Sequence, residues 1–329
     1  MSTSEDALGV RLPFELSPTS LEGVFTTNAP AKGFDPRTAS DASLIKNGLM
    51  WRRPTVEDPL AVRALWDRVM SRDWSAAERI VPEFEVQTGK THNLRRATKE
   101  ADGSFTSPNW SGAVLPGTWV GALGTWEIPT VSPAPEAPEG GGWDSASWVG
   151  LDGVFGSEDV LQAGVEQFVS TKGQASYAAW YEWFVNDPPR HPLPPPYVQQ
   201  TNIPNFPVSP GQTVDVSVQY VNGTGYINFF NATTGQRFSI TLAPPPGATM
   251  SGNTAEWIME VPNGGEGTVS LPKFTPVVFG PAFSCPPNDT PIGNGGTGDI
   301  FNIVEGFGTR LTSVTLDSLE HEVTIDFTG

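Results

Sequence analysis

Gln162, Glu182 and Glu260 are the side chains in this sequence whose types and surroundings best suit chemistry. Each falls in a short segment where side chains alternate in character, and indoles such as Trp180 and Trp183 stand close by in the chain. Alternation of this kind is typical of strands, which send successive side chains to opposite faces. Acids and an amide on an aromatic surface suit an extended ligand, either a peptide or a polysaccharide.

The alternation also predicts which face of each strand is buried. Core faces are expected to carry Leu161, Ala163, Val165 and Val169 on one strand and Ala255, Trp257 and Met259 on a second. The opposite faces then carry Gln162 and Glu166 on the first strand and Glu256, Ile258 and Glu260 on the second. On a third strand Trp180, Glu182 and Phe184 share one face and Tyr181 and Trp183 the other, so both of its faces are aromatic. The polar groups should therefore share one kind of surface.

Three classes of function fit such a surface. Hydrolysis of a peptide by water needs a base, a donor for the developing oxyanion and an acid for the leaving amine. A carboxylate can act first as base and then as acid, and a carboxamide is a donor that keeps its function at acid pH. A β-sandwich glycoside hydrolase would instead pair two acids such as Glu182 and Glu260. A carbohydrate- or peptide-binding module would catalyse nothing.

The elements that position these residues are predicted to be strands. The chain has 329 residues, of which 35 are Gly and 32 are Pro, and this content favours short elements joined by many turns. From Asn109 onward the pattern is that of an all-β antiparallel sandwich. Expected strands are Thr125–Ile128, Ser145–Val149, Val160–Val169, Ser176–Phe184, Thr213–Val221, Gly225–Phe230, Phe238–Leu242, Glu256–Val261 and Glu322–Phe327.

A partly helical leader, residues 1–105, precedes the sandwich of residues 106–329. Short helices are expected at about 59–80, with Asp58 as N-cap of the first and with Val62, Leu65, Trp66, Val69 and Met70 at helical spacing. Ser75 and Glu78 suggest a capping box for a second helix that reaches about Ile80. The polar and basic stretch 86–107 is expected to be a solvated linker accessible to proteases.

Charge divides the chain in the same way. Residues 1–100 hold 14 basic and 14 acidic side chains, whereas residues 101–329 hold 5 and 22, so the whole net charge of −17 lies in the second part. This charge disfavours nucleic acids and anionic membranes as partners. A body so poor in cations is also expected to tolerate acid, because acid unfolding is driven largely by accumulated positive charge.

Neither a metal nor a cofactor is expected. The one cysteine, Cys285, excludes an intrachain disulfide, and His92, His191 and His321 show no ligand spacing. No apolar run is long enough to span a bilayer, and no signal peptide is visible at the start of the sequence. We expect a monomer.

Five blocks resemble the glutamic peptidases, or eqolisins, a family of pepstatin-insensitive acid proteases. The blocks are NWSGAV (109–114), SWVGLDG (147–153), VLQAGVE (160–166), AAWYEWF (178–184) and TAEWIMEV (254–261), in the family's order. The resemblance implies a sandwich of two large antiparallel sheets, lectin-like in architecture. It further implies an acid endopeptidase acting on polypeptides, secreted, and made with an N-terminal propeptide that would correspond to the leader.

The resemblance also assigns roles within the blocks. By motif, Gln162 is the catalytic amide that positions water and stabilises the oxyanion, and Glu260, not Glu256, is the base and then the acid. Further residues match substrate-binding positions around the family's site: Trp110, Trp148, Asp152 and Glu182. The bland alternatives are core packing for the two tryptophans, a turn for Asp152 and a structural role for Glu182. The chain departs from the family at Ala178, where an acid is usual, and at Phe184, where a tyrosine is usual.

The leader is expected to dock through its bases on the acidic body at neutral pH. Acid would neutralise the carboxylates of the body, weaken the contact and expose the site, with a maturation cut within 86–107. The alternative is an accessory extension without this role.

Overall fold

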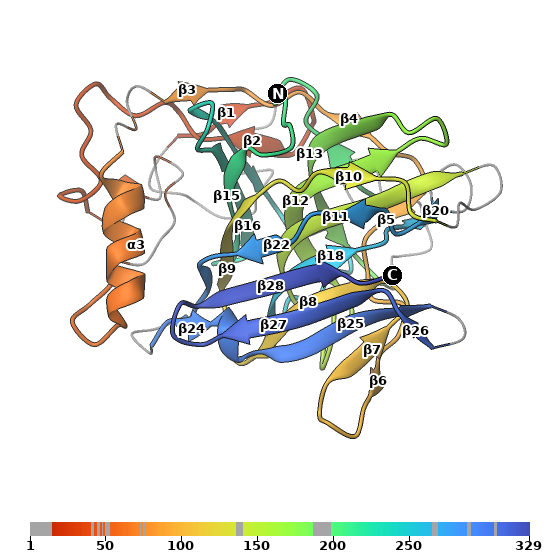
Figure 1. Ribbon diagram of the computed structural model, residues 1–329. Helices are drawn as coiled ribbons and strands as arrows, with labels where there is room; N and C mark the ends of the chain where they lie inside the picture. Colours follow the sequence, from red (N-terminus) through yellow and green to blue (C-terminus); the bar gives the residue numbers. More distant parts are fainter. Residues whose placement is uncertain are drawn as a thin grey trace.

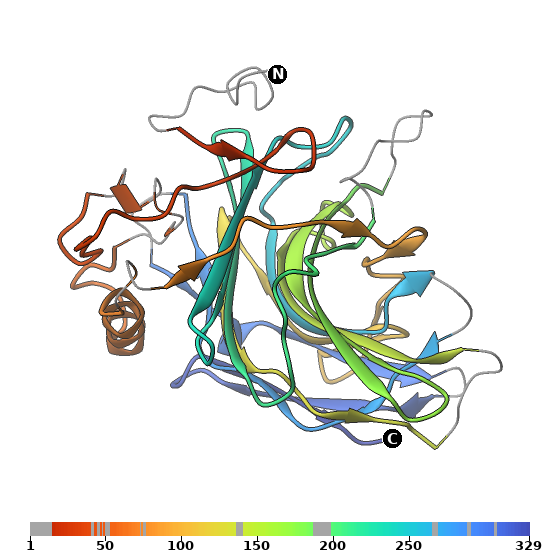
Figure 2. The same ribbon diagram turned by 90° about the horizontal axis from the view of Figure 1, so that it is seen from above.

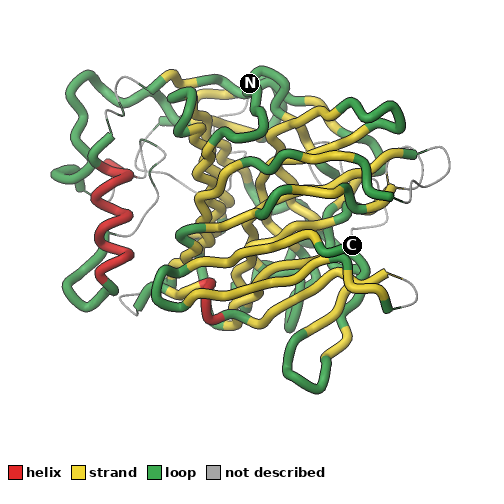
Figure 3. Tube along the Cα trace, in the orientation of Figure 1, coloured by secondary structure: helices red, strands yellow, loops and turns green. Residues whose placement is uncertain are grey.

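Strands dominate the computed structural model (Figures 1 and 3). It describes residues 15–40, 43–44, 47, 49, 53–72, 74, 77–135, 141–186, 199–264, 269–287, 291–305 and 308–329. His191 and Ser75 lie outside these residues. No helix in the described part of the chain is long and apolar enough to cross a membrane.

One large sheet has nine strands. Its members are β1 (Ser17–Pro18), β2 (Val24–Thr26), β3 (Glu78–Arg79), β9 (Gly121–Glu127), β15 (Thr213–Val221), β16 (Thr224–Asn231), β17 (Gln236–Leu242), β23 (Ala282–Cys285) and β24 (Gly293–Asn294). They follow the order β1-β2-β17-β16-β15-β9-β23-β24, and β3 pairs with β17.

The second large sheet has twelve strands and carries the residues of interest. Its members are β4 (Glu85–Val86), β6 (Thr98–Lys99), β7 (Phe105–Ser107), β8 (Trp110–Pro116), β11 (Gly142–Leu151), β12 (Val160–Val169), β13 (Ala175–Phe184), β14 (Thr201–Asn202), β18 (Thr254–Glu260), β20 (Val269–Ser270), β25 (Asp299–Glu305) and β26 (Thr309–Arg310). The central order is β13-β12-β11-β18-β8-β25, and all of these pairs are antiparallel.

Smaller elements complete the fold. They are the pair β10 (Val131–Ser132) and β21 (Lys273–Phe274), the pair β5 (Lys90–Thr91) and β19 (Asn263–Gly264), the three-stranded sheet of β22 (Val277–Phe279), β27 (Thr312–Asp317) and β28 (Glu322–Phe327), the helix α3 (Leu60–Met70) and the 3-10 turn η1 (Gly295–Thr297).

The two large sheets pack face to face around one apolar core (Figure 2). The twelve-stranded sheet contributes the residues that alternation placed inside, including Leu161, Val165 and Trp257, and also Tyr181, all with exposure near zero. The nine-stranded sheet contributes side chains from β15 and β17, among other strands, to the same core. The expectation of a sandwich of two large antiparallel sheets is confirmed. The polar side chains therefore lie on the outer face of the twelve-stranded sheet, away from this core.

The leader folds against both sheets. Helix α3 covers the outer face of the nine-stranded sheet, where its apolar stripe packs near Leu123 and Phe283. The helix is at the left of Figure 1. The chain then passes over the edge of the sandwich between β3 and β4, as Figure 2 shows. From β4 to β7 it lies on the twelve-stranded sheet, where β5 pairs with β19.

Three local expectations for the leader were wrong. Asp58 does not cap α3, because its carboxylate instead accepts the backbone N–H of Thr55 at 2.7 Å, and Pro59 stands at the N-cap without a side-chain bond. No second helix reaches Ile80, because residues 78 and 79 pair with β17 as strand β3. The stretch 86–107 is not solvated throughout: residues 88–89 and 95–103 are exposed, but Lys90, His92 and Phe105 are buried.

Candidate active site

Gln162 and Glu260 project from the outer face of the twelve-stranded sheet on two strands that flank β11. Gln162 on β12 is opposite Gly150, and Glu260 on β18 is opposite Ala146 on that middle strand. Both side chains are completely buried. The strand period that sends Leu161 and Met259 into the core sends these two residues to the other face.

Trp148 on β11 occupies the space between the two strands. A Cβ atom at Gly150 would lie 2.7 Å from its ring, so glycine is needed there for the indole to lie close to the sheet. A Cβ atom at Gly164 would lie 2.1 Å from the carbonyl oxygen of Ser147 and 2.6 Å from the Cβ of Trp148, so glycine is needed there for β12 to lie close to the backbone of β11.

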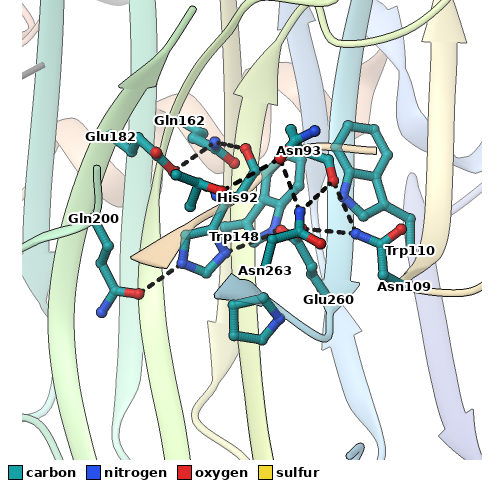
Figure 4. Close-up of polar contacts among 12 residues, drawn as sticks. His92, Asn93, Asn109, Trp110, Trp148, Gln162, Glu182, Gln200, Glu260 and Asn263 are labelled. Atoms are coloured by element: carbon teal, nitrogen blue, oxygen red, sulfur yellow. Dashed lines mark hydrogen bonds and ion pairs between the residues drawn. The ribbon is translucent and has the colours of Figure 1, made fainter. Parts of the chain in front are cut away.

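The carboxylate of Glu260 accepts hydrogen bonds from three side chains (Figure 4). Trp148 Nε1 donates to Oε2 at 2.9 Å, and Asn109 Nδ2 donates to Oε1 at 3.1 Å. Nδ1 of His92 lies 3.0 Å from Oε2. Donors on both oxygens fix the plane of the carboxylate and compensate its burial.

The amide of Gln162 faces a peptide group and an acid. Its Nε2 donates to the carbonyl oxygen of His92 at 2.6 Å and, more weakly, to Glu182 Oε2 at 3.3 Å. Its Oε1 is buried and has no hydrogen-bond partner among the described residues. Burial raises the pKa of Glu182 well above its ordinary value, and the charge of Glu260 adds to this, although the backbone N–H of His92 opposes it by donating at 2.7 Å.

His92 joins these groups into one network, although it belongs to the leader. Its ring stacks on Trp180 with a centroid separation of 3.9 Å and an interplanar angle of 13°. Nε2 of the ring lies 2.7 Å from Oε1 of Gln200. Through its ring, N–H and C=O the residue contacts Glu260, Glu182 and Gln162, and its exposure is zero. The leader therefore seals the site.

A second buried contact anchors the same segment. Lys90 Nζ lies 2.5 Å from Asp144 Oδ2 and also contacts Glu166 Oε1. Burial opposes the charge of Lys90, but the two carboxylates outweigh burial and raise the pKa of this amine. Burial, together with the charge of Glu166, raises the pKa of Asp144 well above its ordinary value, and Lys90 opposes that rise.

Of the four residues expected to bind substrate, three line the network. Trp148 and Glu182 contact Glu260 and Gln162 directly, and Trp110 packs its ring edge-on against Trp148 at 5.0 Å. Asp152 is placed differently. Its carboxylate accepts the backbone N–H groups of residues 251, 252 and 253 at 2.6 to 3.0 Å, so it holds the loop before β18.

Sequence reasoning missed several members of the site. From the sequence, His92 was considered only as a possible metal ligand, and its spacing from the other histidines excluded that role. Gln200 and Asn263 lie in turn-rich segments whose sequences show no periodicity. Asn109 was inside the NWSGAV block but carried no role. Its Nδ2 also donates to the carbonyl of Asn93 at 2.9 Å, and Asn263 Nδ2 donates to the same oxygen at 3.0 Å. The contacts that recruit these residues join positions far apart in the chain, so no local pattern could reveal them.

Comparisons with known proteins agree on the region that builds this site. A model of the peptidase A4 family matches residues 108–327. Aspergillopepsin-2 of Aspergillus niger is 30% identical over 189 residues, which cover 53% of this chain and 62% of that protein. Scytalidopepsin B of Scytalidium lignicola is 29% identical over 172 residues, which cover 51% of this chain and 54% of that protein. The chain thus spans less than two thirds of either relative.

Solved structures share the sandwich. Scytalido-glutamic peptidase with a peptide-based transition-state analog superposes with a TM-score of 0.53 at 20% identity, over 67% of this chain and 98% of that one. SCP-B, an eqolisin-family peptidase in complex with the tripeptide Ala-Ile-His, gives 0.51 at 20% identity over the same shares. At this identity the likeness concerns the fold.

Proposed function

The chain belongs to the peptidase A4 family, and from this premise we propose that it is an acid endopeptidase that uses Glu260 and Gln162. The observation that carries the proposal is the convergence of both side chains on one peptide residue. Gln162 Nε2 contacts the backbone carbonyl of His92, and the Glu260 carboxylate contacts the ring of the same residue. A carbonyl held by an amide donor beside a buried carboxylate is the arrangement that hydrolysis requires.

The chemistry follows from the groups present. Glu260 takes a proton from water, whose oxygen attacks the carbonyl carbon of the substrate, and the carboxyl then gives that proton to the leaving nitrogen. Gln162 Nε2 donates to the oxygen on which negative charge develops, and its unpartnered Oε1 is an acceptor for the attacking water. Trp148 and Asn109 hold the carboxylate in one orientation throughout. Polypeptides are the proposed substrates, consistent with the peptide-based ligands of the two structural relatives.

Digestion of casein at acid pH by full-length protein, incubated in acid beforehand, tests this function. Glu260→Gln and Gln162→Ala should each lower kcat by about 10²–10³-fold or more while the melting temperature changes little. Exposed residues of the same types supply matched controls, Glu127→Gln and Gln174→Ala, which should retain full activity. Full casein digestion by both site variants would refute the proposal. A glycoside hydrolase would ignore casein and would depend on Glu182, and a binding module would turn over neither substrate.

The leader is proposed to make the chain a proenzyme, exported from the cell as the family resemblance implies. Its bases lie against acids of the body, as in Lys90 with Asp144 and Arg72 with Asp215. Acid neutralises such carboxylates and weakens the contacts. A maturation cut is then expected in the exposed stretch 95–103. Acid incubation should yield a smaller stable species that begins there, and an intact, fully active chain would contradict this maturation.

A further inference from the structure

The segment around His92 is bound in the way that extended peptides bind to sheets. Its neighbours pair on two sides: Lys90 and Thr91 lie in register with Gly264 and Asn263 of β19, and the N–H of Gln200 donates to the carbonyl of Lys90 at 2.9 Å. The N–H of Gln87 donates to the carbonyl of Gln200 at 2.9 Å. Main-chain pairing of this kind binds a peptide whatever its side chains are.

Every polar group of the His92 main chain is held by a residue of the site. The N–H donates to Glu182, and the carbonyl accepts from Gln162. The carbonyl of the next residue, Asn93, accepts from Asn109 and Asn263. The carbonyl of the His92–Asn93 peptide bond thus accepts from Gln162, the donor proposed to act on a scissile carbonyl, and the carbonyls on both sides of this bond are held by residues of the site (Figure 4).

The His92 side chain distinguishes this segment from an ordinary substrate. Gln200 Nε2 donates to Glu166 and Asn202, so the amide orientation is fixed and Oε1 faces the imidazole as an acceptor. Glu260 Oε2 is the acceptor at the other ring nitrogen. Each ring nitrogen thus lies within hydrogen-bond distance of an acceptor oxygen. The imidazole therefore contacts the carboxylate that is proposed to act in catalysis, and stacking on Trp180 holds the ring in place.

We propose that residues 90–93 lie in the site as an uncleaved substrate, with His92–Asn93 as the presented bond, and that the His92 imidazole prevents its hydrolysis by engaging Glu260. This inference rests on the proposed function. Hydrolysis would add water across the bond: the oxygen attacks the His92 carbonyl carbon, the C–N bond breaks, and the products are a carboxyl at residue 92 and an amine at residue 93. Glu260 would take a proton from water and return it to that amine, but the imidazole contacts Oε2 of this carboxylate and so prevents it from binding the water.

Substitutions at His92 in the full chain separate the effect of the imidazole ring from the effect of the main-chain contacts. His92→Phe keeps a flat ring against Trp180 and all main-chain bonds but removes both nitrogens. We expect it to cut itself between residues 92 and 93 at least about tenfold faster than wild type at the same acid pH, giving a fragment that begins at Asn93. His92→Asn keeps a nitrogen donor at the position of Nδ1 and should cut between residues 92 and 93 no faster than wild type. Adding Glu260→Gln to His92→Phe should abolish the cut. Intact mass and N-terminal sequencing read the outcome.

Two further measurements show whether a negative result contradicts this inference alone or the proposed function as well. Hydrogen exchange on the full chain with Glu260→Gln should show protected amides at His92 and Gln200 without any turnover, and rapid exchange at both would overturn the substrate-like placement. Casein digestion by acid-incubated wild type reports the proposed function separately. If casein is digested but His92→Phe is not cut between residues 92 and 93, or is cut there no faster than wild type, this inference fails and the peptidase stands. If nothing is cut by any variant, both fail.

Discussion

Trp148 donates its indole N–H to Oε2 of Glu260 over 2.9 Å, although the two residues are 112 positions apart in the chain. They sit on adjacent strands, β11 and β18, and both are fully buried. Through this bond an aromatic residue that also fills the outer face of the sheet sets the direction of the carboxylate. Packing and chemistry are therefore coupled at one side chain.

Trp148→Phe should separate these two roles. Phenylalanine keeps an aromatic ring above Gly150 and Gly164 but has no N–H for Glu260. We expect kcat on casein to fall about tenfold, because one charge-assisted hydrogen bond is lost while Asn109 still holds the other oxygen. Initial rates with a substrate titration measure this, and Trp110→Phe, which removes an indole N–H without a hydrogen-bond partner among the described residues, is the control. An unchanged kcat would show that the N–H does not orient Glu260.

Asp152→Ala should destabilise the fold by about 3 kcal/mol, because three backbone N–H groups of the loop 251–253, among them that of the buried Gly252, would lose their acceptor. Its backbone has φ of 65°, a conformation that Asn tolerates better than Ala. Asp152→Asn keeps the backbone preference and one acceptor oxygen and should therefore cost less. Urea unfolding of the full chain measures both. Equal losses would mean that neither the backbone preference nor the acceptor retained by Asn matters.

Stability should increase as the pH falls from 7 toward about 4, in part because of Glu256. Burial raises the pKa of this carboxyl well above its ordinary value, and neither of its oxygens has a hydrogen-bond partner among the described residues. A raised pKa favours the folded state below the pKa of the unfolded chain, near ~4.3, and this contribution is lost as the pH rises through the folded value. Glu256→Gln, neutral at every pH, should gain on the order of 1–2 kcal/mol over wild type at pH 7 and nothing at pH 4.

Thermal unfolding of both proteins from pH 3.5 to pH 7.5 would measure this difference. The exposed residue Glu127 provides the control, since Glu127→Gln should shift the curve little at any pH. A constant difference between wild type and Glu256→Gln across the range would show that the buried carboxyl does not titrate as expected.

Lys90→Met should cost about 3 kcal/mol at pH 7, because Asp144 and Glu166 would be left buried without their cation. Methionine has nearly the length of the lysine side chain but no charge. The triple variant Lys90→Met/Asp144→Asn/Glu166→Gln should recover most of the loss, and a double-mutant cycle at pH 7 isolates the interaction. If the triple variant is as unstable as Lys90→Met, the loss comes from packing and not from charge.

Local patterns predicted the strands whose two faces differ. The bounds of β12, β15 and β28 are as expected, and the core sides of β12 and β18 follow their alternation. Strand β8 was missed because it is buried on nearly all positions, so its sequence does not alternate. Strands β25 and β27 were also missed. The prediction of a second leader helix was wrong because pairing of residues 78 and 79 with β17 outweighed a local capping signal.

The sequence by itself determined the layers of this protein and the sides on which Gln162 and Glu260 emerge, because a strand repeats every two residues and the core accepts only one face. Tertiary structure alone decided what meets these side chains. His92, Gln200 and Asn109 come from segments without periodicity, and their contacts depend on how β11 places its neighbours and on where the leader crosses the sheet. Hydrogen bonds between distant residues have no local period, so only the assembled fold could reveal that the leader ends up on Glu260.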